Sequence, residues 1–164
     1  MNLRPRLILL IALVALCSSV SSAYADLTAF LGLNPNPDAR SVKGLAIGGG
    51  FLVVGFEFEY ANTSEDEDNF APSLTTGMGN VAVQNPIPVN GMTFYGTVGG
   101  GFYREKLEGI DHQETSFGTN FGGGVKFTLT GPLRLRIDYR VFSLAGSPLH
   151  DRPQRIYAGL TIDF

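Results

Sequence analysis

The segment Leu133-Arg134-Leu135-Arg136-Ile137-Asp138-Tyr139-Arg140-Val141-Phe142 decides the fold. Apolar side chains recur at every second position from Leu133 to Val141, and charged side chains fill the positions between them as far as Arg140. Because successive side chains of a strand point to opposite faces, this period of two predicts a β-strand with one apolar and one charged face. A helix would scatter the same apolar residues around its circumference.

The same alternation recurs along most of the chain after residue 25. In the last ten residues, Ile156, Ala158, Leu160, Ile162 and Phe164 share one face. Eight strands are predicted in all, the first, second and fourth from weaker patterns: Leu27 to Leu33, Val42 to Gly50, Val54 to Tyr60, Thr75 to Val83, Thr93 to Glu105, Ser116 to Leu129, Leu133 to Phe142 and Arg155 to Phe164. Several reach the length of about 9 to 11 residues that a tilted strand needs to cross a bilayer.

The links between these strands alternate in length and composition. Polar links rich in Pro, Asp, Glu and Asn span residues 34–41, 62–72, 107–114 and 146–153, whereas the links near 51–53, 84–91 and 130–132 are mostly shorter or tighter. Outer-membrane barrels have short periplasmic turns and longer extracellular loops. The pattern therefore predicts an up-and-down barrel with both termini on the periplasmic side.

The first 25 residues have the pattern of a secretory signal peptide. Arg4 and Arg6 precede the apolar run 7–16, and Ala23-Tyr24-Ala25 places small residues at the two positions that signal peptidase reads. The run is too short for a transmembrane helix, which needs about 20 apolar residues. We expect cleavage after Ala25, which removes the single cysteine, Cys17, and leaves residues 26–164 as one barrel domain.

A second interpretation of the leader is that of a lipoprotein. Val14-Ala15-Leu16-Cys17 partly resembles the site at which bacterial lipoproteins are cut and acylated. That pattern has a small residue directly before the cysteine, where this chain has Leu16. The Ala-Tyr-Ala site is therefore favoured.

Composition excludes several classes of function. The 164 residues carry a formal net charge of −3 and contain no run of Lys or Arg, so nothing in the sequence provides the basic surface that nucleic acids require. The acidic stretch 65–68 lacks the Gly and late Glu of an EF-hand calcium loop and is expected to be a solvated loop. No motif for a cofactor or a metal is present, and none is expected.

Glycine runs within the predicted strands favour a narrow closed barrel over a soluble sandwich. Gly48-Gly49-Gly50, Gly99-Gly100-Gly101 and Gly122-Gly123-Gly124 are flanked by aromatic residues in phase with the strand period. Inward-facing glycines leave room for long charged side chains on facing strands. We therefore predict a plugged, polar lumen. Its charged side chains either form a network of pairs or contact lumen water without specific partners: Glu57, Glu59, Lys126, Arg134, Arg136, Asp138, Arg140, Arg155 and Asp163.

The chain resembles the small eight-stranded outer-membrane barrels of the OmpA transmembrane-domain, opacity-protein and OmpX-like type. The resemblance rests on the segments 54–60 (VGFEFEY) and 94–103 (FYGTVGGGFY) and on a C-terminus in which Leu160, Ile162 and Phe164 match an insertion signal. It implies an integral protein of the outer membrane, inserted by the barrel assembly machinery and in contact with outer-membrane lipid and lipopolysaccharide.

The specific task remains open between a structural or surface-interaction role and a narrow channel for small solutes. A soluble periplasmic ligand-binding barrel and a lipid A-modifying enzyme are less favoured. The enzyme would need Ser116 as a nucleophile with a histidine, and His112 and His150 both fall in predicted loops. We expect no catalysis.

Overall fold

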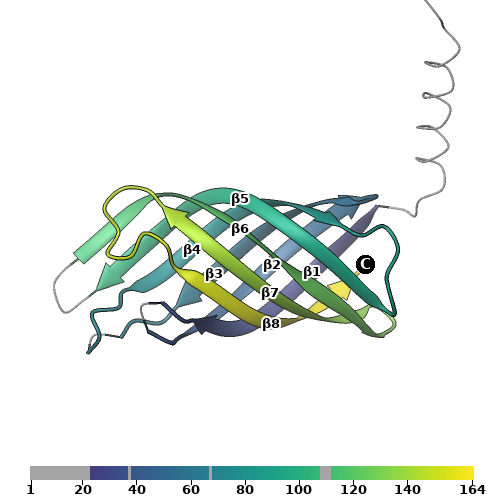
Figure 1. Cartoon of the computed structure of the whole chain (residues 1–164), viewed down its shortest axis with the longest axis horizontal. Coiled ribbons are helices and arrows are strands. Elements are labelled where there is room, and N and C mark those ends of the chain that lie inside the picture. The colour runs from purple at the N-terminus through teal and green to yellow at the C-terminus, as the bar shows by residue number, and fades with distance from the viewer. Residues whose placement is uncertain (1–22, 37, 67, 108–111) are drawn as a thin grey trace, which may run out of the picture.

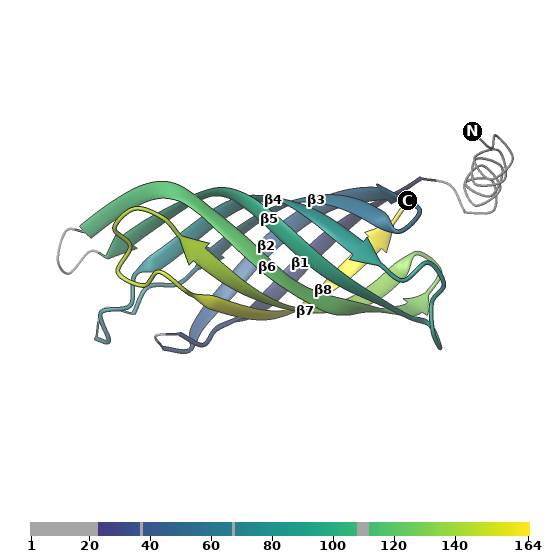
Figure 2. The same cartoon turned by 45° about the horizontal axis from the view of Figure 1, so that its top comes forward.

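Eight strands form one closed barrel in which every strand pairs antiparallel with its neighbours in the chain (Figures 1 and 2). The structure, a computed structural model, describes residues 23–36, 38–66, 68–107 and 112–164. The strands are β1 (Tyr24–Asn34), β2 (Arg40–Phe51), β3 (Val54–Thr63), β4 (Ser73–Gln84), β5 (Met92–Leu107), β6 (His112–Thr130), β7 (Leu133–Leu144) and β8 (Gln154–Asp163). This confirms the predicted eight-stranded up-and-down barrel. Several strands contain more residues than the ranges predicted from the sequence.

The start of β1 differs from the expected start of the domain. Tyr24 and Ala25 belong to the strand: they pair in register with Gly50 and Gly49 of β2, and Ala25 exchanges both backbone hydrogen bonds with Phe164. The arginines, the apolar run and the cysteine of the predicted leader lie outside the described residues. Another difference is His112, which was expected in a loop and is instead the first residue of β6.

The links divide between the two ends of the barrel. The tight turns after β2 and β6 and the link between β4 and β5 lie at the end where the chain begins β1 and finishes β8 (Figure 1). The other four links, which include the two longest, 64–72 and 145–153, lie at the opposite end. Leu52 and Gly131 adopt positive φ angles of 62° and 52° in the two tight turns. Below, the two ends are called the turn end and the loop end.

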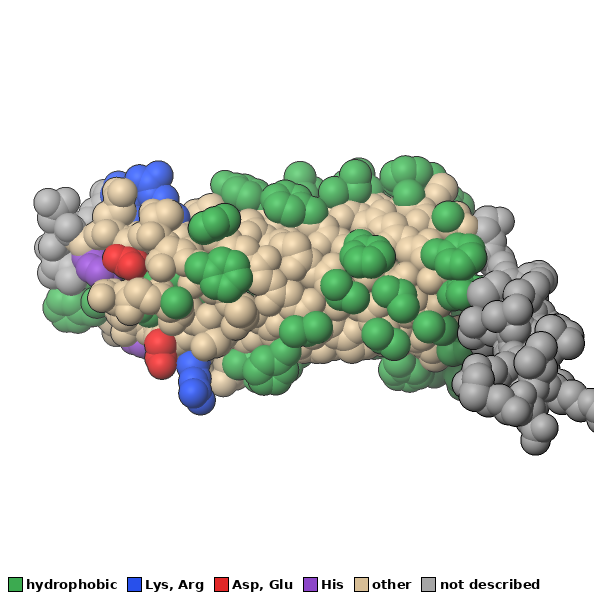
Figure 3. Space-filling model, turned by 90° about the horizontal axis from the view of Figure 1, so that it is seen from above, with side chains coloured by type: hydrophobic (Ala, Val, Ile, Leu, Met, Phe, Trp, Pro, Cys, Tyr) green, Lys and Arg blue, Asp and Glu red, His purple; other side chains and the backbone are tan. Residues whose placement is uncertain are grey.

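The outward face of the barrel is apolar along most of its length. Large hydrophobic side chains are exposed on all eight strands: Leu27, Leu31, Leu33, Leu45, Ile47, Phe51, Val54, Phe56, Phe58, Tyr60, Val81, Val83, Phe94, Val98, Phe102, Phe117, Phe121, Leu129, Ile137, Tyr139, Ile156, Leu160 and Ile162. In Figure 3 the charged side chains of the visible face gather at the loop end, on the left, and hydrophobic side chains are spread over the rest of the barrel to the right. A surface of this kind is stable against hydrocarbon rather than water.

The inward face holds the polar side chains and two small apolar clusters. One cluster comprises Leu74, Met78, Tyr103, Phe142 and Leu144, and the other comprises Phe30, Val42, Ala61 and Tyr157. The strands approach so closely that a Cβ atom at the inward-facing Gly122 would lie 2.1 Å from the carbonyl oxygen of Tyr139. Among the described residues, no helix is long and apolar enough to cross a membrane.

Candidate functional site

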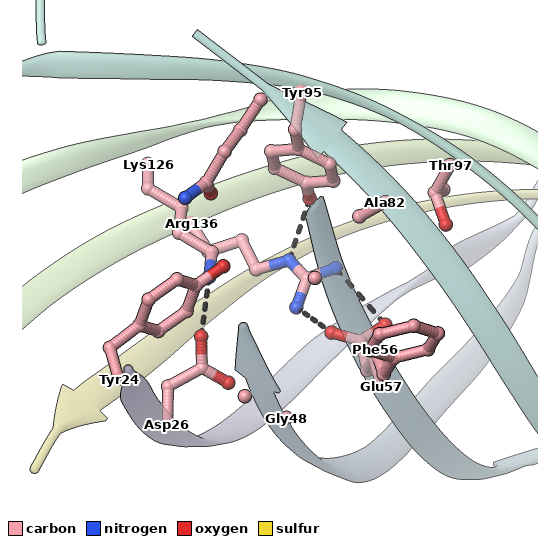
Figure 4. Close-up of a pocket in the computed structure, with 13 residues that line it drawn as sticks. Tyr24, Asp26, Gly48, Phe56, Glu57, Ala82, Tyr95, Thr97, Lys126 and Arg136 are labelled. Atoms are coloured by element: carbon pink, nitrogen blue, oxygen red, sulfur yellow. Dashed lines mark hydrogen bonds and ion pairs between the residues drawn. The ribbon is translucent and has the colours of Figure 1, made fainter. Parts of the chain in front are cut away.

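Buried ion pairs join opposite walls of the barrel lumen. Arg136 of β7 forms ion pairs with Glu57 of β3 and, at 2.9 Å, with Asp138 of its own strand. Its Nε atom also donates a hydrogen bond to the hydroxyl of Tyr95 at 2.6 Å (Figure 4). Since β3 and β7 lie four strands apart in a ring of eight, the Arg136–Glu57 pair spans the full width of the lumen.

Arg140 extends this network by one step toward the loop end. Its guanidinium lies 2.7 Å from Glu57, 3.0 Å from Asp138 and 3.1 Å from Glu59. Both Arg140 and Glu59 are fully buried. Each of the three carboxylates therefore faces at least one guanidinium, which offsets the large cost of removing these charges from water.

Arg155 of β8 completes the network. Its Nη1 lies 2.8 Å from Glu59, and its Nη2 donates a hydrogen bond to Thr76 at 3.1 Å. The guanidinium also packs against the ring of Phe142, 4.6 Å from the ring centroid. Arg140 and Arg155 are direct neighbours in the register of β7 and β8, so Glu59 separates two like charges that would otherwise repel each other.

The alternation of side chains explains how this site forms. Glu57 and Glu59 are two residues apart on β3, and Arg136, Asp138 and Arg140 alternate in the same way on β7. A period of two therefore directs all five side chains into the lumen and the apolar residues between them outward. We refer to these five residues together with Arg155 as the central network.

Two further ion pairs lie nearer the turn end of the lumen. Lys126 contacts Asp26 at 2.5 Å, and Arg134 contacts Asp163 at 2.5 Å. Lys126 and Asp26 are buried, whereas Arg134 and Asp163 are partly exposed at the mouth. A cavity of about 220 Å³ lies at this mouth, and Lys126 and Arg136 are among the residues that line a second cavity of only about 20 Å³.

All nine charged residues singled out in the sequence point inward, but the structure does not bring them into one network. Six of them form the central network, whereas Lys126, Arg134 and Asp163 belong to separate pairs. Sequence reasoning missed Asp26, the partner of Lys126, because it was taken as the first residue of the mature domain. It also missed Tyr95, although this side chain lay on the polar phase of its strand.

The loop end of the lumen holds another buried carboxylate. Glu105 accepts a hydrogen bond from the backbone of Leu149 at 2.8 Å, and His112 Nε2 lies 3.6 Å from Glu105. Arg40 donates hydrogen bonds to the carbonyls of Pro72 and Asn36. These contacts tie loop segments to the barrel rim. Ser116 has no hydrogen bond to His112 or His150 in the described part of the chain.

The central network generates a prediction about stability. Replacing Glu59 by Gln removes the one carboxylate that forms an ion pair with Arg155 among the residues that the structure describes, and it leaves this buried cation without a direct counter-charge. We expect the free energy of unfolding to fall by about 3–5 kcal/mol, as measured by urea titration of the barrel refolded in lipid vesicles.

The matched control is Asp163→Asn, which removes a carboxylate from the partly exposed pair at the mouth. This change is expected to cost no more than about 1 kcal/mol. Equal losses in the two variants would contradict a special role for the buried network.

Comparisons with known proteins agree with this architecture. The barrel resembles the N-terminal β-barrel domain of Pseudomonas aeruginosa OprF, with a TM-score of 0.66 and 17% identity over 86% of this chain and 97% of that domain. It also resembles Neisserial surface protein A (NspA), with a TM-score of 0.65 and 16% identity over 87% of this chain and 96% of that protein. At these identities the likeness concerns the fold alone. No curated protein sequence gives a significant match.

A family model provides the evidence for membership. The model of the outer membrane protein beta-barrel domain matches residues 9–164, which is most of the chain. The match agrees with the closed ring of eight strands, the apolar outer face and the polar lumen. The chain therefore belongs to the outer membrane protein beta-barrel family and is an integral protein of the bacterial outer membrane.

Proposed function

We propose that the protein is a non-conducting outer-membrane barrel with a structural or surface-interaction role. The observation that carries the proposal is the central network, in which Arg136 and Arg140 reach Glu57 across the lumen. An eight-stranded barrel has an interior just wide enough for side chains to fill. Paired charges that fill this width leave no continuous path for a solute.

A second layer supports the same proposal. On the loop side of the central network, Leu74, Met78, Tyr103, Phe142 and Leu144 form a buried apolar cluster within the lumen. A hydrated ion that passed the ion pairs would then have to shed water against hydrocarbon, which is costly. The lumen is therefore closed by two layers of different chemistry.

The loops at the loop end of the barrel offer the surface for interaction. The loop after β3 forms a small bridge between Asp66 and Ala71 and presents Phe70, which is 65% exposed. One structural neighbour is named a surface protein, which fits a role in which the barrel holds loops outside the cell. We also propose that Leu160, Ile162 and Phe164 engage the assembly machinery during insertion.

The position of Ser116 argues against a catalytic role. The family is described as an outer membrane beta-barrel domain, and the lipid A-modifying alternative would require Ser116 to act with a histidine on the lipid face. Ser116 instead lies on the inward phase of β6, next to Gly146 of the loop before β8. This position separates the hydroxyl from the membrane.

The plugged lumen predicts the electrical behaviour of the barrel. Purified protein in a planar lipid bilayer should give no stable conductance steps at moderate voltage. The double variant Glu57→Ala/Arg136→Ala, which removes one carboxylate and one guanidinium together, should increase the frequency of openings. Reproducible steps from the unaltered protein would instead establish the narrow channel as the function.

The orientation of the barrel can be tested by labelling single cysteines in a Cys17→Ser background. Ser147→Cys lies in a loop at the loop end, and Val89→Cys lies in the link between β4 and β5 at the turn end. On intact cells, a membrane-impermeant maleimide should label Ser147→Cys and leave Val89→Cys unlabelled until the outer membrane is disrupted. The reverse pattern would show that the barrel is inserted the other way.

A further inference from the structure

The outer wall of the barrel is hollowed over β1, β2, β3 and β8, with Leu135 of β7 at one side. The groove has a volume of about 640 Å³, within the range of about 300–1,000 Å³ that is usual for sites of small ligands. Its floor includes the short side chains of Ala29 and Ala158, and its sides include Leu45, Tyr60 and Leu160. Ala29 pairs in register with both Leu45 and Leu160, so a methyl group lies between two long side chains.

A single cation lines this apolar groove. Lys43 lies on the outward phase of β2, is exposed, and has no ion pair or hydrogen bond with any residue that the structure describes. Its cross-strand neighbour Asn62 also points outward and donates a hydrogen bond to Thr75 at 2.9 Å. An unpaired ammonium beside an amide forms a donor pair suited to an anionic oxygen.

The register places Lys43 at the edge of the apolar band. Two residues nearer the turn end, the outward side chains of β2 and β3 are those of Leu45 and Tyr60. Two residues nearer the loop end, the outward side chain of β2 is that of Ser41. In one direction around the wall, the residues paired in register with Lys43 are polar as well, namely Asn62, Thr75 and Arg104. Along β2 itself the outward side chains change from apolar to polar at Lys43, as they do where a strand reaches the lipid headgroups and long cationic side chains extend toward the interface.

From these observations, we propose that the groove binds one lipid A molecule of the outer leaflet. An acyl chain lies over Ala29 and Ala158, and a phosphate of the headgroup accepts hydrogen bonds from Lys43 Nζ and the Asn62 amide. The groove faces the membrane, so hydrocarbon covers it, and the unpaired positive charge at its headgroup edge selects an anionic phosphate over a neutral headgroup. A lipid bound here would fill a hollow that freely exchanging acyl chains fill poorly.

This proposal rests on the orientation proposed above, which the cysteine-labelling experiment tests independently. If the loops faced the periplasm, Lys43 would lie at the inner leaflet. A failure of the labelling prediction and a failure of lipid binding are therefore distinguishable.

The test is native mass spectrometry of the intact barrel released from detergent, titrated with lipid A and, separately, with chemically dephosphorylated lipid A. We expect one molecule of lipid A to be retained, at an affinity at least about tenfold above that of the dephosphorylated form, because dephosphorylation removes the charge-assisted hydrogen bond to Lys43. Lys43→Gln should lower the affinity for lipid A by the same factor. Ala29→Leu, which fills the floor of the groove, should lower it as well.

Two variants control for general effects of charge and bulk. Arg104→Gln removes a cation outside the groove, from the row of residues paired in register with Lys43. Val98→Leu enlarges an exposed outward side chain of β5. Both should retain lipid A as the unaltered protein does. Equal retention of the two lipids, unchanged binding by Lys43→Gln or Ala29→Leu, an equal loss in Arg104→Gln, or a second copy of the barrel in place of lipid would overturn the proposal.

The start of β1 carries a second, independent inference. The Tyr24 ring lies 5.9 Å from Lys126 Nζ, at the mouth of the lumen (Figure 4), and a Cβ atom at Gly50 would lie only 2.6 Å from the Tyr24 hydroxyl. Ala25 exchanges backbone hydrogen bonds of 3.0 and 2.8 Å with Phe164. Cleavage after Ala25 would remove both residues from the barrel.

We infer that signal peptidase cuts after Ala23, so that the mature chain begins with Tyr24. Ser21-Ser22-Ala23 presents small residues at both required positions, as Ala23-Tyr24-Ala25 does. Only the earlier cut preserves the hydrogen bonds of Ala25 with Phe164 and the pairing of Tyr24 and Ala25 with β2.

N-terminal sequencing of the protein purified from outer membranes, together with its intact mass, tests this cut. Tyr24 as the first residue is the expected result. A chain that begins at Asp26, retains its leader or carries an acylated Cys17 would overturn the inference.

Discussion

The pairing of β1 with β8 is the constraint on which the rest of the structure depends. Within a bilayer no water can satisfy free backbone groups, so a sheet that crosses the membrane must close on itself. Here the ring closes through a continuous register from Asp26 with Asp163 to Leu33 with Ile156. Closure with eight strands fixes the width of the interior, and this width in turn fixes which side chains the lumen can hold.

The composition of the lumen follows from that width. Three guanidinium groups, those of Arg136, Arg140 and Arg155, meet three carboxylates, those of Glu57, Glu59 and Asp138, so the central network is neutral as a whole. Long side chains from opposite walls can meet because the glycines between them have no side chain that would occupy the lumen. At Gly122, a methyl group would already collide with the backbone of the next strand.

Much of the fold could be predicted from the sequence, because alternation is a local property of each strand. The alternation of apolar and charged residues in 133–142 predicted both that this segment is a strand and which of its side chains share a face. Partners within the lumen depend on the relative height of strands that are far apart in the chain, and the sequence contains no measure of this height. For that reason Lys126 could be assigned to the lumen, whereas its pairing with Asp26 rather than with Glu57 could not be predicted.

The seam between β1 and β8 also determines when the protein can fold. Its closing hydrogen bonds join Ala25 of the first strand to Phe164, which directly follows the eighth. Contacts between such distant parts of a chain form slowly, and until they form both edge strands expose unpaired backbone groups that invite aggregation. The barrel therefore cannot close before β8 has been synthesised. Because a sheet within a bilayer must have no free edge, insertion of the strands into the membrane and closure of this seam are coupled.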